Sequence, residues 1–186
     1  EVNDLNTGRE RLAGAGANNT AALAIGGEVP AGPTVAITEL WNGTNWTEVN
    51  DLNTAIQFFA AVGTTTAALA FGGEPPATDK TEIWNGTNWT EVNDLNTARS
   101  KLAGAGTTTS ALAFGATPIA GKGGLTESWN GTNWTELNDL NTPRETPSGA
   151  GSNNTSALAF AGKGPGVTAA TEEWVAGPTT ATIGDS

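Results

Sequence analysis

Acidic side chains recur at one fixed position along the chain, two residues before each of four tryptophans. They are Glu39, Glu82, Glu127 and Glu172, and a second acidic series stands two residues after a further set of tryptophans, at Glu48, Glu91 and Glu136. Pairs of carboxylates hydrolyse glycosidic bonds in many enzymes. A catalytic pair, however, needs two carboxylates in unlike environments, whereas this spacing is the same in every unit. The repetition favours a structural or solvated role, and we expect no enzymatic activity.

The other residue types leave little for catalysis. Arginines recur at a matching position, with Ile56 in the second unit, and we expect them to pair with neighbouring carboxylates: Arg9, Arg99 and Arg144. The chain contains no His and no Cys, which removes the usual general base near neutral pH and the commonest zinc and copper ligands. A net charge of −11 argues against a nucleic-acid partner. No apolar run approaches the roughly 18 residues that span a bilayer, so we expect no membrane insertion.

Aspartates form a third repeated series in the segment NDLNT, at Asp51, Asp94 and Asp139. A ring of such loops would offer the oxygen ligands that Ca²⁺ prefers. The alternative is a set of Asx turns, in which each side chain bonds the local backbone. We favour the turns, and we expect neither a metal nor another cofactor.

The elements that carry these residues follow from the period of the sequence. Tryptophans recur about every 45 residues, a period typical of solenoids, propellers and arrays, at Trp41, Trp84, Trp129 and Trp174. Within the second unit, residues 58–63 and 68–73 are short apolar runs bounded by turn residues, which predicts two paired strands. Residues 81–84 and 87–92 flank Asn85-Gly86, and Asn-Gly between β-prone runs predicts a hairpin with a type I′ turn.

Each unit is therefore expected to be a four-stranded antiparallel meander. Such a meander cannot bury both faces alone, and radial stacking around an axis gives a β-propeller. We predict an all-β fold, a single four-bladed propeller domain over residues 1–186. The blades are expected at about residues 9–49, 55–92, 98–137 and 143–183, with residues 1–7 as the end of a preceding repeat or a closing strand. We expect a closed ring first of all. The alternatives are an open segment of a larger propeller and a ring that a second copy completes.

The repeat resembles the Kelch-like propeller repeat. The match lies in a glycine doublet at the end of the second strand, as in Gly72-Gly73, and in a Trp in the third strand. It departs from that pattern in having no Tyr and a period shorter than the usual roughly 50 residues. The amino-acid sequence of the repeat is also similar to tandem repeats in virion proteins of tailed bacteriophages, in tail fibres or capsid-associated modules. That resemblance implies a non-enzymatic structural or binding module, a virion or extracellular location, and partners among virion proteins or host-surface glycans and proteins.

Two parts of the repeat are candidates for binding. Loops that differ between units are where specificity is expected, because a rigid scaffold presents loops for function: residues 28–36, 74–80, 116–124 and 163–169. Outward-facing tryptophans would suit sugar rings, which gives the alternative function of a lectin-like propeller with one weak site per blade, at Trp46, Trp89 and Trp134. The competing interpretation, which we favour, is that these three rings pack between blades. Irregular unit lengths argue against an artificial consensus repeat, and association of several copies stays open.

Overall fold

The computed structural model describes residues 2–117, 119–164 and 166–175, and its strands fall into four antiparallel sheets. Blade 1 contains β1 (Ala13–Asn18), β2 (Ala21–Ile25), β3 (Thr38–Trp41) and β4 (Trp46–Val49). Blade 2 contains β5 (Ala60–Gly63), β6 (Ala68–Phe71), β7 (Thr81–Trp84) and β8 (Trp89–Glu91). Blade 3 contains β9 (Ala103–Thr107), β10 (Ser110–Phe114), β11 (Thr126–Trp129) and β12 (Trp134–Glu136). Blade 4 contains β13 (Ser148–Asn153), β14 (Ser156–Phe160) and β15 (Thr171–Val175).

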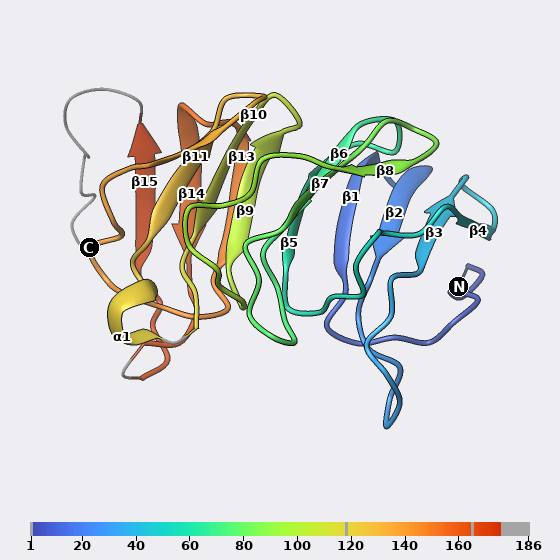
Figure 1. The fold of residues 1–186 in the computed structure, drawn as a ribbon, viewed down its shortest axis with the longest axis horizontal. Coiled ribbons are helices and arrows are strands. Elements are labelled where there is room, and N and C mark those ends of the chain that lie inside the picture. The colour runs from blue at the N-terminus through green and yellow to red at the C-terminus, as the bar shows by residue number, and fades with distance from the viewer. Residues whose placement is uncertain (1, 118, 165, 176–186) are drawn as a thin grey trace.

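Every sheet is a meander in which each strand pairs with the next one along the chain. The expected all-β, four-bladed β-propeller is confirmed (Figure 1). Blade 4 was expected at about residues 143–183; it has three strands among the described residues, and its expected last part, residues 176–183, lies outside them. One short helix, α1 (Ile119–Lys122), lies in the third variable loop, where the sequence predicted only a loop.

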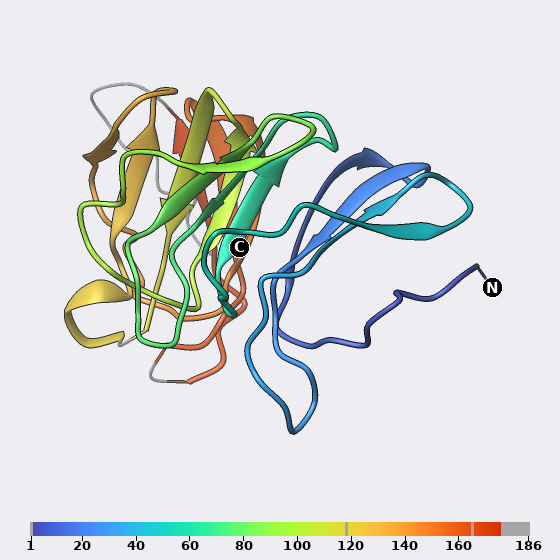
Figure 2. The same cartoon turned by 45° about the vertical axis from the view of Figure 1, so that its right-hand side comes forward.

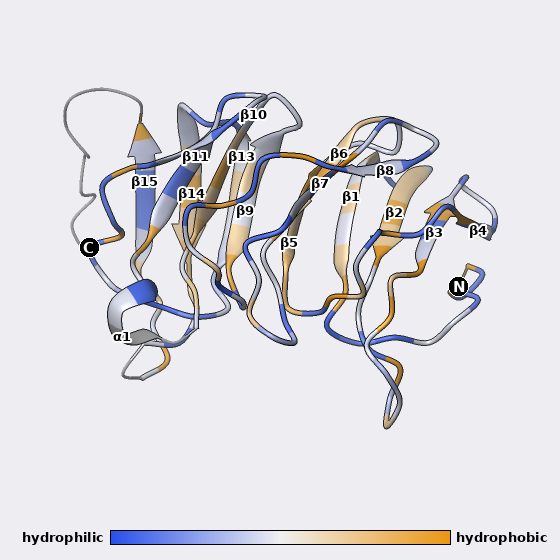
Figure 3. Ribbon diagram, viewed as in Figure 1, coloured by the Kyte–Doolittle hydropathy of each residue, from blue (hydrophilic) through white to orange (hydrophobic). Residues whose placement is uncertain are grey.

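The first strands of the blades lie side by side in chain order, β1 against β5, β5 against β9, and β9 against β13. Figure 1 shows blade 1 at one end of this series and blade 4 at the other, and Figure 2 shows blade 1 from a direction in which its four strands stand clear. Apolar residues concentrate on the first and second strands of the blades, while the connecting segments are mostly hydrophilic (Figure 3).

Each blade has two unlike faces, because alternate residues of its second strand point to opposite sides of the sheet. The Leu/Phe face carries Leu23 and Ile25, Leu69 and Phe71, Leu112 and Phe114, and Leu158 and Phe160 in blades 1 to 4. The Ala/Trp face carries Ala22, Ala24 and Trp41, then Ala68, Ala70 and Trp84, then Ala111, Ala113 and Trp129, then Ala157, Ala159 and Trp174.

The hydrophobic core consists of three layers between the blades. In each layer the Leu/Phe face of one blade packs on the Ala/Trp face of the next. Gly104 shows how closely the faces approach, because a Cβ there would lie 2.5 Å from Phe71 Cζ of the preceding blade. Trp84 and Trp129 are among the largest side chains in the first two of these layers, and both are almost fully buried.

The connection between the third and fourth strands differs from its prediction. A type I′ turn needs positive φ at both Asn and Gly, but Gly86 has φ 92° and Asn85 does not share the left-handed conformation. The loop is four residues long, because Trp84 pairs with Trp89. The Asn85 side chain closes it by accepting hydrogen bonds from the amides of Thr87 and Asn88, each at 2.9 Å. An Asx-type loop is available without the strained asparagine that a type I′ turn requires.

The N-terminal segment contacts blade 1 in the way that the internal links contact their blades. Asn3 Nδ2 donates to Asn45 Oδ1 at 2.6 Å, and Asn50 Nδ2 donates to Asn88 Oδ1 of blade 2 at 2.7 Å. Val2 belongs to no strand. Asn6 also bonds blade 1, because its amide donates to Glu39 Oε2 at 2.8 Å. The described residues of this segment therefore lie on blade 1 and do not form the closing strand on blade 4 that was the alternative expectation.

Trp84→Ala should lower the free energy of unfolding by about 3–5 kcal/mol, because it removes a buried indole between two blades and leaves a cavity. Urea unfolding followed by circular dichroism measures this loss. Val167→Ala, at a side chain that is 93 % exposed, is the control and should change stability by less than about 0.5 kcal/mol. Equal stabilities of the two variants would contradict the layered core.

Candidate functional site

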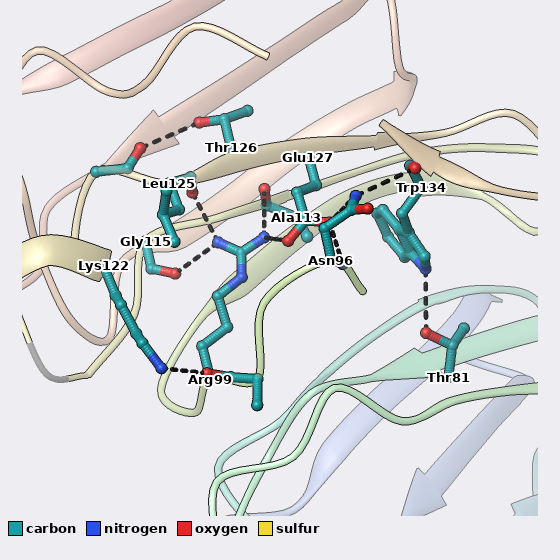
Figure 4. Close-up of polar contacts among 12 residues, drawn as sticks. Thr81, Asn96, Arg99, Ala113, Gly115, Lys122, Leu125, Thr126, Glu127 and Trp134 are labelled. Carbon is teal, nitrogen blue, oxygen red and sulfur yellow. Dashed lines mark hydrogen bonds and ion pairs between the residues drawn. The ribbon is translucent and has the colours of Figure 1, made fainter. Parts of the chain in front are cut away.

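Three of the repeated glutamates, Glu82, Glu127 and Glu172, accept hydrogen bonds from the link that comes from the preceding blade, and Figure 4 shows this for Glu127. Glu39 of blade 1 accepts in the same way from Asn6 of the N-terminal segment. At the joint between blades 2 and 3, Glu127 Oε2 accepts hydrogen bonds from the backbone and side-chain nitrogens of Asn96 at 2.7 and 2.8 Å. Arg99 Nη2 lies 3.2 Å from Glu127 Oε1, and both side chains are buried. The expected pairing of the arginines with carboxylates is confirmed, also for Arg9 with Glu39 and Arg144 with Glu172.

Arg99 also binds the backbone of blade 3. Its Nη1 donates to the carbonyl oxygens of Leu125 at 2.7 Å and Gly115 at 3.1 Å. Burial lowers the pKa of the Arg99 guanidinium, and the charge of Glu127 opposes that shift. The pKa of Lys80, at the surface of blade 2, is shifted in the opposite direction: hydrogen bonds to Glu91 and then to Asp94 raise it. The buried pairs thus hold the links in place.

Blade 2 shows what the joint becomes without its arginine. Ile56 occupies the equivalent position, and Glu82 is still buried. Its oxygens accept from the Asn53 amide at 2.8 Å and the Thr54 amide at 3.1 Å. The link amides alone therefore satisfy the glutamate.

Two of the tryptophans considered for sugar binding are buried in the joints. Trp89 and Trp134 are each 5 % exposed. Their indole nitrogens donate across the joint to the hydroxyls of Thr38 and Thr81, at 3.1 and 3.0 Å. These rings pack between blades, which is the interpretation favoured from the sequence, and their faces are not free to stack on a sugar. Trp46, in blade 1, keeps a partly exposed ring.

The link aspartates bond backbone, although not in the local turns that we expected. Asp51 Oδ1 accepts from the Thr38 amide and Asp94 Oδ1 from the Thr81 amide, each at 3.1 Å. Each carboxylate thereby fixes the start of the third strand of its own blade, thirteen residues earlier. Over the described ranges, no group of three or more His, Cys, Asp or Glu side chains is placed to hold a metal ion.

The variable loops gather at one end of the propeller, because each connects the second and third strands of its blade (Figure 1). Isolated bridges tie the loops to the residues that precede the first strands: Glu10 with Glu28, Gln57 with Glu74, Ser100 with Thr117, and Glu145 with Lys163. We call this end the loop face. The opposite end carries the four-residue Asn-Gly loops, which are nearly identical in sequence.

One residue per blade forms a continuous row on the loop face, which we call the inner row: Arg11, Phe58, Lys101 and Thr146. The Phe58 amide donates to the Arg11 carbonyl at 3.0 Å, the Lys101 amide to the Phe58 carbonyl at 2.7 Å, and the Thr146 amide to the Lys101 carbonyl at 2.7 Å. All four residues have φ between 48° and 58°, a conformation that non-glycine residues rarely adopt. The hydrogen bonds from blade to blade stabilise it.

The side chains of the inner row differ in kind, unlike those of the joints. The Phe58 ring lies between two cations, with Arg11 Cζ at 4.9 Å and Lys101 Nζ at 5.2 Å from its centroid, within the range of cation–π attraction. Arg11 also forms an ion pair with Glu28 of the first loop. This partly exposed mixture of apolar, positive and negative groups is suited to contact with another macromolecule.

The sequence did not reveal the inner row, because its members share no residue type. The signal that marks it is positional: each member precedes the small-residue run of its blade by one or two residues.

Among the described residues, no helix is long and apolar enough to cross a membrane. No protein family matches the chain, and no curated protein is similar to it.

Glu127→Leu should lower the free energy of unfolding by about 3–5 kcal/mol, because it leaves the Arg99 guanidinium buried without its partner charge. Arg99→Ile should cost less, since it leaves Glu127 with its link amides, as Glu82 is left in blade 2. Urea unfolding followed by tryptophan fluorescence compares the two.

Glu136→Leu, at an exposed position of the same blade, is the matched control and should change stability by less than about 0.5 kcal/mol. A larger loss for Arg99→Ile than for Glu127→Leu would contradict the assignment of the joint.

Proposed function

We propose that this protein is a non-enzymatic structural and binding module of a tailed-phage virion, a fibre part or a surface decoration. It presents its variable loops to a protein or to the host surface. The observation that carries the proposal is the segregation of the repeat: constant residues form the joints and the far end, while the four loops that differ between blades share one face.

The use of the charged residues supports a binding rather than a catalytic role. The repeated glutamates are held by link amides and arginines inside the joints. The charged groups of the inner row are attached to rigid backbone beside the loops. A rigid scaffold with unlike loops at one end is the usual arrangement for recognition, and the resemblance of the repeat to phage virion repeats indicates where such recognition takes place.

The lectin-like alternative requires outward-facing rings in each blade. Since Trp89 and Trp134 are buried and bonded to threonines of the preceding blade, no observation favours one sugar site per blade. The Kelch-like character of the repeat likewise belongs to this proposal and is supported by the glycine doublets and the third-strand tryptophans alone.

Mass spectrometry of virions purified from cells that produce this protein should detect it in stoichiometric amounts in the particles. Its absence from particles would overturn the virion assignment. The loop assignment has a separate readout: Ala77→Asp combined with Val167→Asp should weaken binding of the labelled protein to host-cell envelopes or to virions by at least about tenfold.

Both substituted side chains are exposed tips of variable loops, so the fold should be unaffected. Thr87→Asp, exposed at the opposite end of the propeller, is the matched control and should leave binding unchanged. Equal effects of the loop and control variants would show that the loop face does not carry recognition.

A further inference from the structure

The two ends of the blade series carry faces that are buried everywhere else. Leu158, on the Leu/Phe face of blade 4, is 37 % exposed, whereas its equivalent Leu112 in blade 3 is 0 % exposed. On the Ala/Trp face of blade 1 the opening lies beside β1: Ala22 is partly exposed and Gly14 is exposed, while Ala24 and Trp41 are buried. The equivalents of Ala22 in blades 2 and 3, Ala68 and Ala111, are completely buried. The last Leu/Phe face and the first Ala/Trp face are therefore the two halves of a fourth joint that the described residues of one chain do not complete.

The indole–threonine hydrogen bond that crosses the first two joints is unpaired at both ends of the blade series. Trp89 and Trp134 donate to a threonine of the preceding blade, but the indole N–H of the equivalent Trp46 has no partner among the described residues. Thr171 of blade 4 occupies the position of the accepting threonines and is exposed. Donor and acceptor of one further bond of the same kind thus stand on opposite ends.

The backbone ladder of the inner row ends in the same way. Each amide donates to the carbonyl of the preceding blade. The Arg11 amide at the start and the Thr146 carbonyl at the end have no backbone partner within the part of the chain that the structure describes. An Arg11 amide placed after blade 4 would continue this ladder by donating to the Thr146 carbonyl.

The shapes match as well as the hydrogen bonds. A phenylalanine of one blade covers a glycine of the next, as a Cβ at Gly149 would lie 2.5 Å from Phe114 Cζ. At the open ends, Phe160 is partly exposed, and a Cβ at Gly14 would meet nothing nearer than the Leu23 carbonyl at 3.5 Å. The exposed backbone at Gly14 therefore has room for a phenylalanine ring from a neighbouring blade.

We propose that the protein associates head to tail with a second copy of itself, the Leu/Phe face of blade 4 packing on the Ala/Trp face of blade 1. The contact combines features of the joints within the chain, with Phe160 over Gly14 as Phe114 lies over Gly149, and Trp46 donating to Thr171 as Trp89 donates to Thr38. The contact is heterologous, so a pair of copies still has one unused face at each end. Further copies either close the assembly as a ring or extend it as a filament.

A second copy is favoured over closure within one chain because blade 1 and blade 4, which carry the two open faces, lie at opposite ends of the blade series (Figure 1). It is favoured over an unrelated partner because the copy supplies every feature that the internal joints use: the apolar faces, the indole donor, the threonine acceptor and the phenylalanine–glycine contact. The contact lies on the ends of the blade series and leaves the loop face free, so this inference stands independently of the proposed function.

The test uses two variants, each of which disables one end. Leu158→Glu places a charge on the blade 4 face, and Ala22→Glu places a charge on the blade 1 face. Sedimentation velocity of the unaltered protein should show concentration-dependent assemblies of two or more copies. Each variant alone should associate at least about tenfold more weakly, while an equimolar mixture of the two should form a dimer, because each supplies the intact face that the other lacks.

Val167→Glu, exposed on a variable loop, is the matched control and should assemble like the unaltered protein. Circular dichroism spectra and melting curves of the variants confirm that the monomers remain folded. A protein that stays monomeric at all concentrations, or variants that assemble alone as well as the unaltered protein does, would overturn the proposal. Weak assembly of the mixture would also overturn it, because the mixture contains one intact copy of each of the two faces that the proposed contact needs.

Discussion

The whole structure depends on the packing of one blade on the next, a leucine and an aromatic or branched side chain on one side against alanines and a tryptophan on the other. Blades as small as these expose both faces, and neither face can be buried within the same sheet. Small residues on the receiving side allow the sheets to approach until Phe71 touches the backbone at Gly104. The apolar layers between blades, rather than a single central core, hold the protein together.

Polar groups at the joints follow from this packing. When the faces close, the link from one blade is carried into a region shielded from water, and its amides need partners there. The repeated glutamate supplies them, and Arg99 or its equivalents then satisfy both the carboxylate and the nearby carbonyls of the blade. The indole N–H of Trp134 finds the Thr81 hydroxyl for the same reason. Residues that resemble catalytic groups in the sequence therefore serve the construction of the fold.

Because the repeated charged residues serve the joints, the loop face is where we propose that binding takes place. Joint residues recur because every joint has the same geometry, while the loops between the second and third strands are free of that constraint. The inner row combines both properties, since its backbone is fixed by hydrogen bonds from blade to blade and its side chains vary from Arg11 to Phe58 to Lys101. Rigid attachment with variable chemistry is what a recognition surface requires.

The sequence by itself determined the number of blades, their meander order and the pairing of the arginines with acidic partners, because period, turn residues and charge recurrence are local patterns. It also led to the view that the second-series tryptophans pack between blades. It did not determine the four-residue loop at Asn85-Gly86, since a side chain that accepts two amides replaces the turn that the dipeptide alone predicts. Nor did it reveal the inner row, whose residues are related only by their place in neighbouring blades. The stacking of blades that lie some 45 residues apart in the sequence decides which faces meet and which stay open. It also decides which unlike side chains become neighbours, and only the tertiary structure shows these contacts.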